Sequence, residues 1–372
     1  MSQNNSINES NSLKVVTTPG TSPQIVALLQ KTIFGTKGKT RYRQKHIANG
    51  MASKKNLEFI QIQKSGTTLG TTGVVTRKVK SGIEELTSFY IRYLSITNPF
   101  RNSKSSSTNS SSKKRNRKSS LKKMICEKIT SHFELPVLES ESKAAFYAFV
   151  ESDNENSKNL CVELGFNPLR RISTVLFSRF FPRTNSSISK AKLRDSSEIS
   201  DKLSDLYKDH SFYFEDELFE SGSYFCFKKD GKVVAGIRCK PVSWELVEVP
   251  GASGFLMQNV LPYLPFTNRL FNPKELKFLA FDYALYSENN ESLVLDLMEH
   301  CSSIYGIHIG MYWGDIDSNL VSWLKSSQKL GFLHNLKGDV TAEVMYRFVN
   351  FTEHQRSELL ARPVFVSALD MT

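Results

Sequence analysis

The sequence has few cysteines and none of the spacings that bind a metal. Five cysteines are scattered along 372 residues, without a Cys-x-x-Cys pair. An odd number of widely separated thiols argues against a disulfide framework and against a structural zinc site. The seven histidines form no pair at helical i, i+3 or i, i+4 spacing. We therefore expect reduced cysteines and no metal centre.

Long hydrophobic runs are also missing. No stretch approaches the ~20 apolar residues that a membrane-spanning helix requires. Residues 1–12 are rich in Asn and Ser and have no apolar core, so they lack the pattern of a signal peptide. The sequence predicts a disordered tail over residues 1–20, no membrane segment and a cytoplasmic location.

Acidic residues are absent from the segment that holds most of the positive charge. The formal net charge is +12, and nine basic residues without a single acid lie from Arg101 to Lys123. Residues 102–120 contain no apolar side chain, which predicts a disordered insert because nothing there can be buried. The cations attract phosphates, but no aromatic residue lies among them to stack on bases. Nucleic acid is therefore not expected as a partner.

A repeated order of elements fills the rest of the chain. The length suits two domains on a prior of about 150 residues each. The hydrophobic pattern predicts helix, antiparallel meander, helix, strand, helix and strand, and this order occurs twice. We expect an α+β fold of two tandem domains, each a mixed, mostly antiparallel sheet flanked by helices. The expected boundaries are a first domain over 21–182, a linker over 183–196 and a second domain over 197–372.

The two halves end in a similar way. In the first half a strand over 146–150 is followed by a helix that begins near Asn154 and ends in Leu-Gly-Phe at residues 164–166. In the second half a strand over 307–313 and a helix are followed by Leu-Gly-Phe at residues 330–332. A glycine after a helix takes the left-handed cap position, and the next apolar residue packs on the last turn. Either copy alone is an ordinary helix end, but both lie at equivalent places in the repeat.

These endings resemble the final strand and helix of the GNAT superfamily of acyl-CoA N-acyltransferases. The resemblance covers about residues 20–350 and implies two GNAT-like domains in tandem. It implies that acetyl-CoA or another acyl-CoA is the co-substrate, bound in a notch where the central strands separate. It also implies direct attack on the thioester by the amine of a small molecule or peptide, assisted by a general base. The sequence does not identify the acceptor, the acyl chain or the oligomeric state.

The resemblance places the cofactor site of the first half at the end of the central strand. Ile96 ends this strand, and Arg101 takes the first position of the family's Arg-x-x-Gly-x-Gly/Ala loop. The glycines of that loop are absent, and Ser119, Ser120 and Lys122 lie where the chain enters the next helix. Two readings stay open. Small serines let backbone amides approach a phosphate, or the loop has lost its phosphate site.

Three further residues of the first half are candidates. Asn154 either caps the helix that follows it or turns its amide toward the cofactor. Cys161 takes the place of the tyrosine that protonates the leaving thiolate in the family, although a helical cysteine is commonly a small hydrophobic residue. Glu85, beside Glu84 at the start of the central strand, is the candidate general base, and the alternative is that both are turn residues.

The second half departs further from the family pattern. The segment over 287–292 after its central strand has two acids and neither Arg nor Gly, so it would repel a pyrophosphate. Asn319 lies one position out of register with Asn154. We therefore expect a degenerate second domain and activity in the first. The alternative function is a catalytically inactive GNAT-like protein that acts as a binding or interaction module.

Overall fold

The structure is a computed structural model that describes residues 13–52, 54–82, 84–96, 123–220, 222–265, 267–337 and 340–372. Within these ranges, no helix combines the length and the apolar character needed to cross a membrane. The same ranges contain no group of three or more His, Cys, Asp or Glu residues placed to hold a metal ion.

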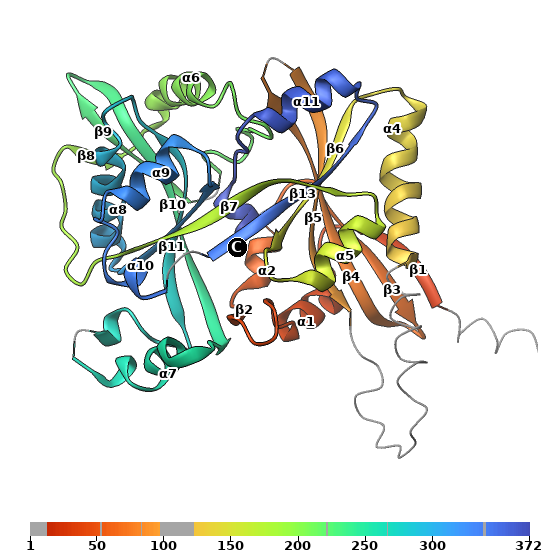
Figure 1. Cartoon of the computed structure of the whole chain (residues 1–372), viewed down its shortest axis with the longest axis horizontal. Helices are drawn as coiled ribbons and strands as arrows, with labels where there is room; N and C mark the ends of the chain where they lie inside the picture. The colour runs from red at the N-terminus through yellow and green to blue at the C-terminus, as the bar shows by residue number, and fades with distance from the viewer. Residues whose placement is uncertain are drawn as a thin grey trace, which may run out of the picture.

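One mixed sheet runs through both halves of the molecule (Figure 1). Its strand order is β1-β3-β4-β5-β6-β13-β7-β12-β11-β10-β9-β8, and the short strand β2 pairs with β10 outside this path. The strands of the first half are β1 Leu13–Pro19, β2 Arg41–Gln44, β3 Leu57–Lys64, β4 Thr67–Ser81, β5 Glu84–Ile96, β6 Ala144–Glu151 and β7 Asn167–Ser178. Those of the second half are β8 Ile188–Lys190, β9 Ser223–Lys229, β10 Lys232–Glu248, β11 Leu276–Leu285, β12 Ile309–Asp315 and β13 Val340–Val349.

The two halves exchange their last strands. Strand β7 leaves the first half and pairs with β12 of the second, so that Ser178 lies opposite Ile309. Strand β13 returns from the second half and pairs with β6, so that Ala144 lies opposite Val349. The two exchanged strands pair with each other in the middle of the sheet. Each half is therefore completed by the other, and the sheet is symmetric in its order about the β13–β7 pair.

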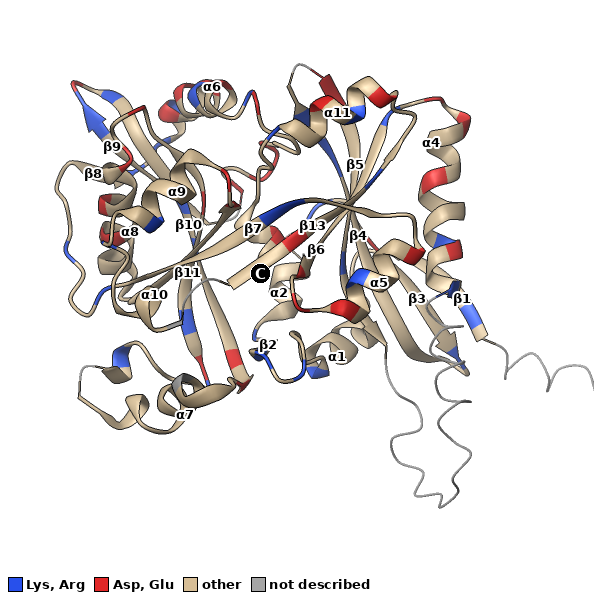
Figure 2. Cartoon of the chain, in the orientation of Figure 1, with Lys and Arg blue, Asp and Glu red and all other residues tan. Residues whose placement is uncertain are grey.

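Helices cover both faces of this sheet. In the first half they are α1 Pro23–Lys31, α2 Ile47–Ala52, a helix over 123–129 that continues through a π turn Thr130–Glu134 into α4 Leu135–Glu139, and α5 Glu155–Glu163. In the second half they are α6 Ser196–Leu206, α7 Gly251–Asn259, α8 Ser292–Tyr305, α9 Asn319–Ser326, α10 Phe332–Lys337, α11 Glu353–Ala361 and α12 Ala368–Met371. Short 3-10 turns lie at Leu193–Asp195, Leu261–Tyr263 and Thr267–Arg269. Acidic and basic residues are interspersed along α6 and α11 (Figure 2).

The hydrophobic core consists of three clusters. One lies under the helix over 123–139 and α5 in the first half, with Phe146 and Ile129 buried in it. A second lies under α8 and α9 in the second half. The third and largest joins both halves on the other face, from Leu29 of α1 to Leu203 of α6. Because this core is shared, the two halves form one packing unit.

Two segments differ from the sequence expectations. Leu13–Pro19, expected in a disordered tail, forms strand β1 and pairs with β3. Ile188–Lys190, inside the expected linker, forms strand β8 and pairs with β9. In each segment a partner distant in sequence decides the structure.

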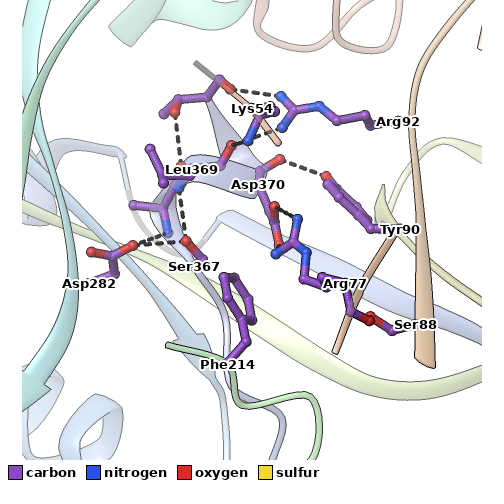
Figure 3. Close-up of polar contacts among 12 residues, drawn as sticks. Lys54, Arg77, Ser88, Tyr90, Arg92, Phe214, Asp282, Ser367, Leu369 and Asp370 are labelled. Atoms are coloured by element: carbon purple, nitrogen blue, oxygen red, sulfur yellow. Dashed lines mark hydrogen bonds and ion pairs between the residues drawn. The ribbon is translucent and has the colours of Figure 1, made fainter. Parts of the chain in front are cut away.

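The last ten residues of the sequence connect the halves in the centre of the molecule (Figure 3). Asp282 of β11 accepts hydrogen bonds from Ser367 Oγ at 3.0 Å and from the backbone N–H of Ala368 at 2.8 Å. Arg238 Nε of β10 donates to the same carboxylate at 2.7 Å. Further along the segment, Asp370 accepts two hydrogen bonds from Arg77 of β4, at 2.8 and 3.1 Å. The segment is therefore tied to β10 and β11 at one end and to β4 at the other.

Charge pairing favours the ionised form of the buried Asp370 carboxyl. Burial acts to raise the pKa of Asp370, but the cations Arg77, Lys54 and Arg92 outweigh it and hold that pKa below its usual value. The side chains of Asp370 and Arg77 are only 2% and 5% exposed. Removing one partner of such a pair leaves a charge without compensation in a medium of low dielectric constant.

We predict that Asp282→Ala lowers the free energy of unfolding by about 3–5 kcal/mol, because the buried Arg238 guanidinium then has no counter-charge. Chemical denaturation followed by circular dichroism measures this change. The control is Glu275→Ala, which removes an ion pair at 3.6 Å with the exposed Lys277 and should cost less than about 1 kcal/mol. Equal effects of the two variants would contradict the structural role given to Asp282.

Candidate active site

Strands β5 and β6 separate along their length. They pair in parallel only from Thr87 and Ala144 to Tyr90 and Tyr147. Beyond this point β5 remains paired with β4 up to Ile96, and the rest of β6 remains paired with β13. In the described residues no strand pairing spans the opening, so the two facing edges present backbone N–H and C=O groups to it.

A bulge marks the place where β5 leaves its neighbour. The register between β4 and β5 shifts between Thr71 and Gly73. Opposite this shift, Tyr93 has a φ of 55°, in the left-handed region that non-glycine residues seldom adopt. A Cβ on Gly73 would come within 3.2 Å of the Tyr93 ring, so the missing side chain leaves room for the tyrosine. Strain of this kind is frequent at functional sites.

A cavity of about 320 Å³ occupies the opening. Phe34 and Tyr42 line it from the segment between α1 and α2, and these residues pack against the core shared by both halves. Ile129 and Phe166 line it on the other side, where they belong to the core under the first-half helices. The cavity therefore passes between the two strands and connects the two faces of the sheet.

Polar groups gather on the face that carries Tyr42. Glu151, the last residue of β6, accepts hydrogen bonds from the backbone N–H of Thr36 at 3.2 Å and from its Oγ1 at 3.1 Å. Arg92 of β5 is 8% exposed and donates to the carbonyl oxygens of Leu369 at 2.9 Å and Thr372 at 2.7 Å. Burial, followed by the nearby Glu151 charge, raises the pKa of Tyr42, so this phenol is protonated.

Helix α5 supplies two side chains on the opposite face. Asn154 caps the helix, because its side-chain oxygen accepts a hydrogen bond from the Ser157 N–H at 3.1 Å, and both residues line the cavity. Cys161 lies two turns further along and also lines it. Burial and the neighbouring Cys126 raise the pKa of Cys161 to about 11. This thiol is therefore protonated at neutral pH.

The second half contains an equivalent opening. Strands β11 and β12 pair in parallel only from Leu279 to Phe281. The register of β11 then shifts against β10, and Tyr283 has a φ of 46°. Ser318 caps α9 by accepting from the Val321 N–H at 3.4 Å. Bulge, separation and helix cap thus repeat the first half, with Ser318 in the place of Asn154.

Both strands of this second opening bond to residues near the end of the sequence. Asp315 at the end of β12 accepts a hydrogen bond from the Val364 N–H at 2.9 Å. Asp282 of β11 accepts one from the Ala368 N–H at 2.8 Å. Residues 364–368 are therefore held against both separated strands. In the first half, a cavity occupies the corresponding opening.

The structure brings two of the sequence candidates together and separates two others. Asn154 and Cys161 line the same cavity. Glu85 lies at the start of β5, where its exposed side chain is 4.0 Å from Lys78. Glu85 lies five residues before Tyr90, where β5 and β6 separate. Five residues of a strand span roughly 17 Å, so the Glu85 side chain does not reach the cavity. Ile96 packs against the core under the first-half helices and is not among the lining residues.

Four further candidates, Arg101, Ser119, Ser120 and Lys122, lie outside the described residues. Sequence reasoning missed Glu151, Arg92 and the aromatic side of the cavity. Glu151 had a signal, since it is a carboxylate at the end of a strand and only three residues before Asn154. Arg92 and Tyr42 had no local sequence signal, because the segments that surround them come from distant parts of the sequence.

Comparison with known proteins supports the same architecture. No protein-family model matches the sequence, and no curated protein matches it. Among solved structures, Saccharomyces cerevisiae N-myristoyltransferase with bound myristoyl-CoA and inhibitors is similar with a TM-score of 0.58, 9% identity and coverage of 95% of this chain and 86% of that chain. The same enzyme with bound myristoyl-CoA gives a TM-score of 0.53, 8% identity and coverage of 95% and 89%.

At this identity the likeness establishes the fold. The expected α+β architecture of two similar halves is confirmed, and the fold is like that of the N-myristoyltransferase structures. The sequence resemblance rested on two helix endings, and the structure adds the repeated bulges and strand separations around them.

The helix cap at Asn154 gives a test of the site's geometry. We predict that Asn154→Ala lowers the free energy of unfolding by about 1 kcal/mol, because the Ser157 N–H loses its partner. Asn154→Asp should keep the stability, since an Asp side chain caps equally well. Ser318→Ala, at the equivalent cap, should behave like Asn154→Ala in the same denaturation experiment. An Asp variant as unstable as the Ala variant would show that Asn154 is not held as a cap.

Proposed function

We propose that this protein is an acyl-CoA-dependent N-acyltransferase with its active site in the first half. The observation that carries the proposal is the contrast between the two openings. The opening between β5 and β6 holds a cavity of about 320 Å³, whereas both strands around the opening between β11 and β12 bond to the backbone of residues 364–368. Support also comes from the yeast enzyme of similar fold, which was solved with bound myristoyl-CoA.

The facing strand edges suit the co-substrate. The pantetheine arm of coenzyme A carries amide groups, and an extended chain with amides can bond to an unpaired strand edge as another strand would. We infer that this arm lies between the edges of β5 and β6, with the thioester near Tyr93. Arg101, Ser119, Ser120 and Lys122 stay the predicted phosphate contacts. We propose acetyl-CoA or another acyl-CoA as the co-substrate. The volume of the cavity does not distinguish between acyl chain lengths.

The reaction follows from the groups around the thioester. The amine nitrogen attacks the thioester carbon, a C–N bond forms, and the C–S bond breaks with release of the coenzyme A thiolate. A backbone N–H near the bulge at Tyr93 stabilises the oxyanion of the tetrahedral intermediate. We propose that Glu151, the carboxylate among the lining residues, is the general base that accepts the proton released by the amine.

Cys161 has a smaller role in this scheme than a catalytic acid. Its pKa of about 11 lies well above the ~8.5 of an ordinary thiol. Transfer of its proton to a departing thiolate is therefore uphill. We propose that the Cys161 thiol donates a weak hydrogen bond to the leaving sulfur and that the thiolate takes its final proton from solvent.

The co-substrate site is tested by filling the cavity. We predict that Cys161→Phe weakens acyl-CoA binding at least about tenfold, or ~1.4 kcal/mol, in calorimetric titrations with acetyl-CoA and myristoyl-CoA. The matched control is Val162→Phe on the same helix, where the native side chain is 59% exposed and affinity should not change. If the wild-type chain binds neither thioester, the alternative of an inactive interaction module takes the place of this proposal.

The base is tested separately. We predict that Glu151→Gln lowers turnover about 10²- to 10⁴-fold and leaves acyl-CoA affinity unchanged. The glutamine oxygen can still accept from Thr36, so the fold should be intact. Glu155→Gln is the control, since this side chain is 73% exposed at the start of α5. Release of free coenzyme A thiol measures both, and wild-type turnover of the Glu151 variant would remove the assignment.

A further inference from the structure

A second cavity lies beside the first, between the two halves. Its volume is about 490 Å³, and its walls come from the segment over 44–54, from β10 and from the end of the chain. Tyr93 lines both cavities. Tyr42 of the first cavity stacks on Trp244 of the second, with ring centroids 3.9 Å apart and planes at 13°. The two cavities are therefore neighbours separated by aromatic rings, as expected for the two substrates of one reaction.

The charged side chains around this second cavity are mostly basic. Lys45, Lys54 and Lys240 line it, and Glu220 is the acid among the lining residues. Glu220 forms an ion pair with Lys55, so its charge is already compensated. The ammonium group of Lys54 also has a partner already, because its Nζ donates a hydrogen bond to the Leu369 carbonyl oxygen at 2.8 Å (Figure 3).

Lys240 differs from these neighbours. It is only partly exposed, and among the described residues its ammonium group has neither a hydrogen-bond partner nor an ion pair. Burial, followed by the charge of Arg238, lowers its pKa. A partly buried cation without a partner is costly in a protein. A bound anion would supply the missing partner.

The nearby carboxylates do not take this role. Asp282 is held by Arg238 and Asp370 by Arg77. Glu217 acts on Lys240 through space and forms no ion pair with it. The cations of this electrostatic cluster are Arg77, Arg92, Arg238, Lys54 and Lys240, and its carboxylates are Glu217, Asp282 and Asp370. Cationic side chains are therefore in excess in this cluster, and two of them, Lys54 and Lys240, line the cavity.

We propose that the second cavity binds an anionic group of the amine acceptor and that Lys240 is its counter-charge. This inference rests on the acyl-transfer function proposed above and names the acceptor class: a primary amine that carries a carboxylate or a phosphate. The anion lies against Lys240, and the amine extends past Tyr93 to the thioester. Lys240 is a positioning residue here, since it binds the acceptor away from the reacting atoms.

Binding of inorganic phosphate tests the site without any acyl transfer. Calorimetry should detect millimolar phosphate binding to the wild-type chain and at least a tenfold loss in Lys240→Met. Lys240→Arg should keep most of the affinity, because it preserves the charge, and this separates an anion site from a lysine that works as a base. The control is Lys229→Met, an exposed lysine at the end of β9, which should bind as the wild type does. Absence of binding to the wild type, or equal binding to Lys240→Met, overturns the inference.

Acceptor choice gives the second readout. Amidated Gly-Asp and Gly-Asn dipeptides have the same amino terminus and differ in one charge. With acyl-CoA, the wild type should use the Asp peptide at least tenfold better in kcat/KM, and Lys240→Met should lose this preference while it still uses the Asn peptide. Equal use of both peptides by the wild type overturns the anion site and leaves acyl transfer intact. Failure to bind acyl-CoA overturns the proposed function instead, so the two failures are distinguishable.

Discussion

The buried hydrogen bonds and the Arg77–Asp370 ion pair that hold residues 364–372 in the centre of the molecule distinguish the two halves. The fold is nearly symmetric, since each half has a bulged central strand, a separated parallel pair and a capped helix. A symmetric fold would have two equivalent openings. The N–H groups of Val364 and Ala368 bond to Asp315 and Asp282 at the second opening, and the first opening holds the cavity. One peptide segment thus distinguishes the two halves of the repeat, and in the described part of the chain the candidate active site lies in the first half.

The exchange of β7 and β13 makes this arrangement rigid. Each exchanged strand is paired along both of its edges, and the largest core cluster extends through both halves. The second cavity is built from both halves, so its shape depends on their fixed relation. Strand β2 adds to this, because it pairs with β10 and forms the ion pairs Arg41–Glu248 and Arg43–Glu245. Hinge motion between the halves would have to break sheet pairing and core contacts together.

Local sequence signals predicted the repeat and part of the site. Asn154 and Cys161 were found because a strand end, a helix cap and a Leu-Gly-Phe ending lie close together in the sequence. Glu85 was predicted as the base because it lies at the start of the central strand β5. Strands β5 and β6 instead separate toward the opposite end of β5, and Glu151 lies at that end of β6. The strand exchange and Lys240 gave no local signal. Both depend on contacts between segments more than 100 residues apart, and hydrophobic periodicity does not encode such pairing.

Arg92 and Asp282 show how little sequence change separates the two openings. Each precedes the left-handed tyrosine of its central strand, so the two residues occupy equivalent positions. Asp282 accepts from the Ala368 N–H, and Arg92 donates to the carbonyl oxygens of Leu369 and Thr372. A short helical turn exposes N–H groups at its start and C=O groups at its end, so an acid suits the first and a cation the second. Opposite charges at one repeated position therefore fix the direction in which α12 lies, with its start at the second opening and its end beside the first.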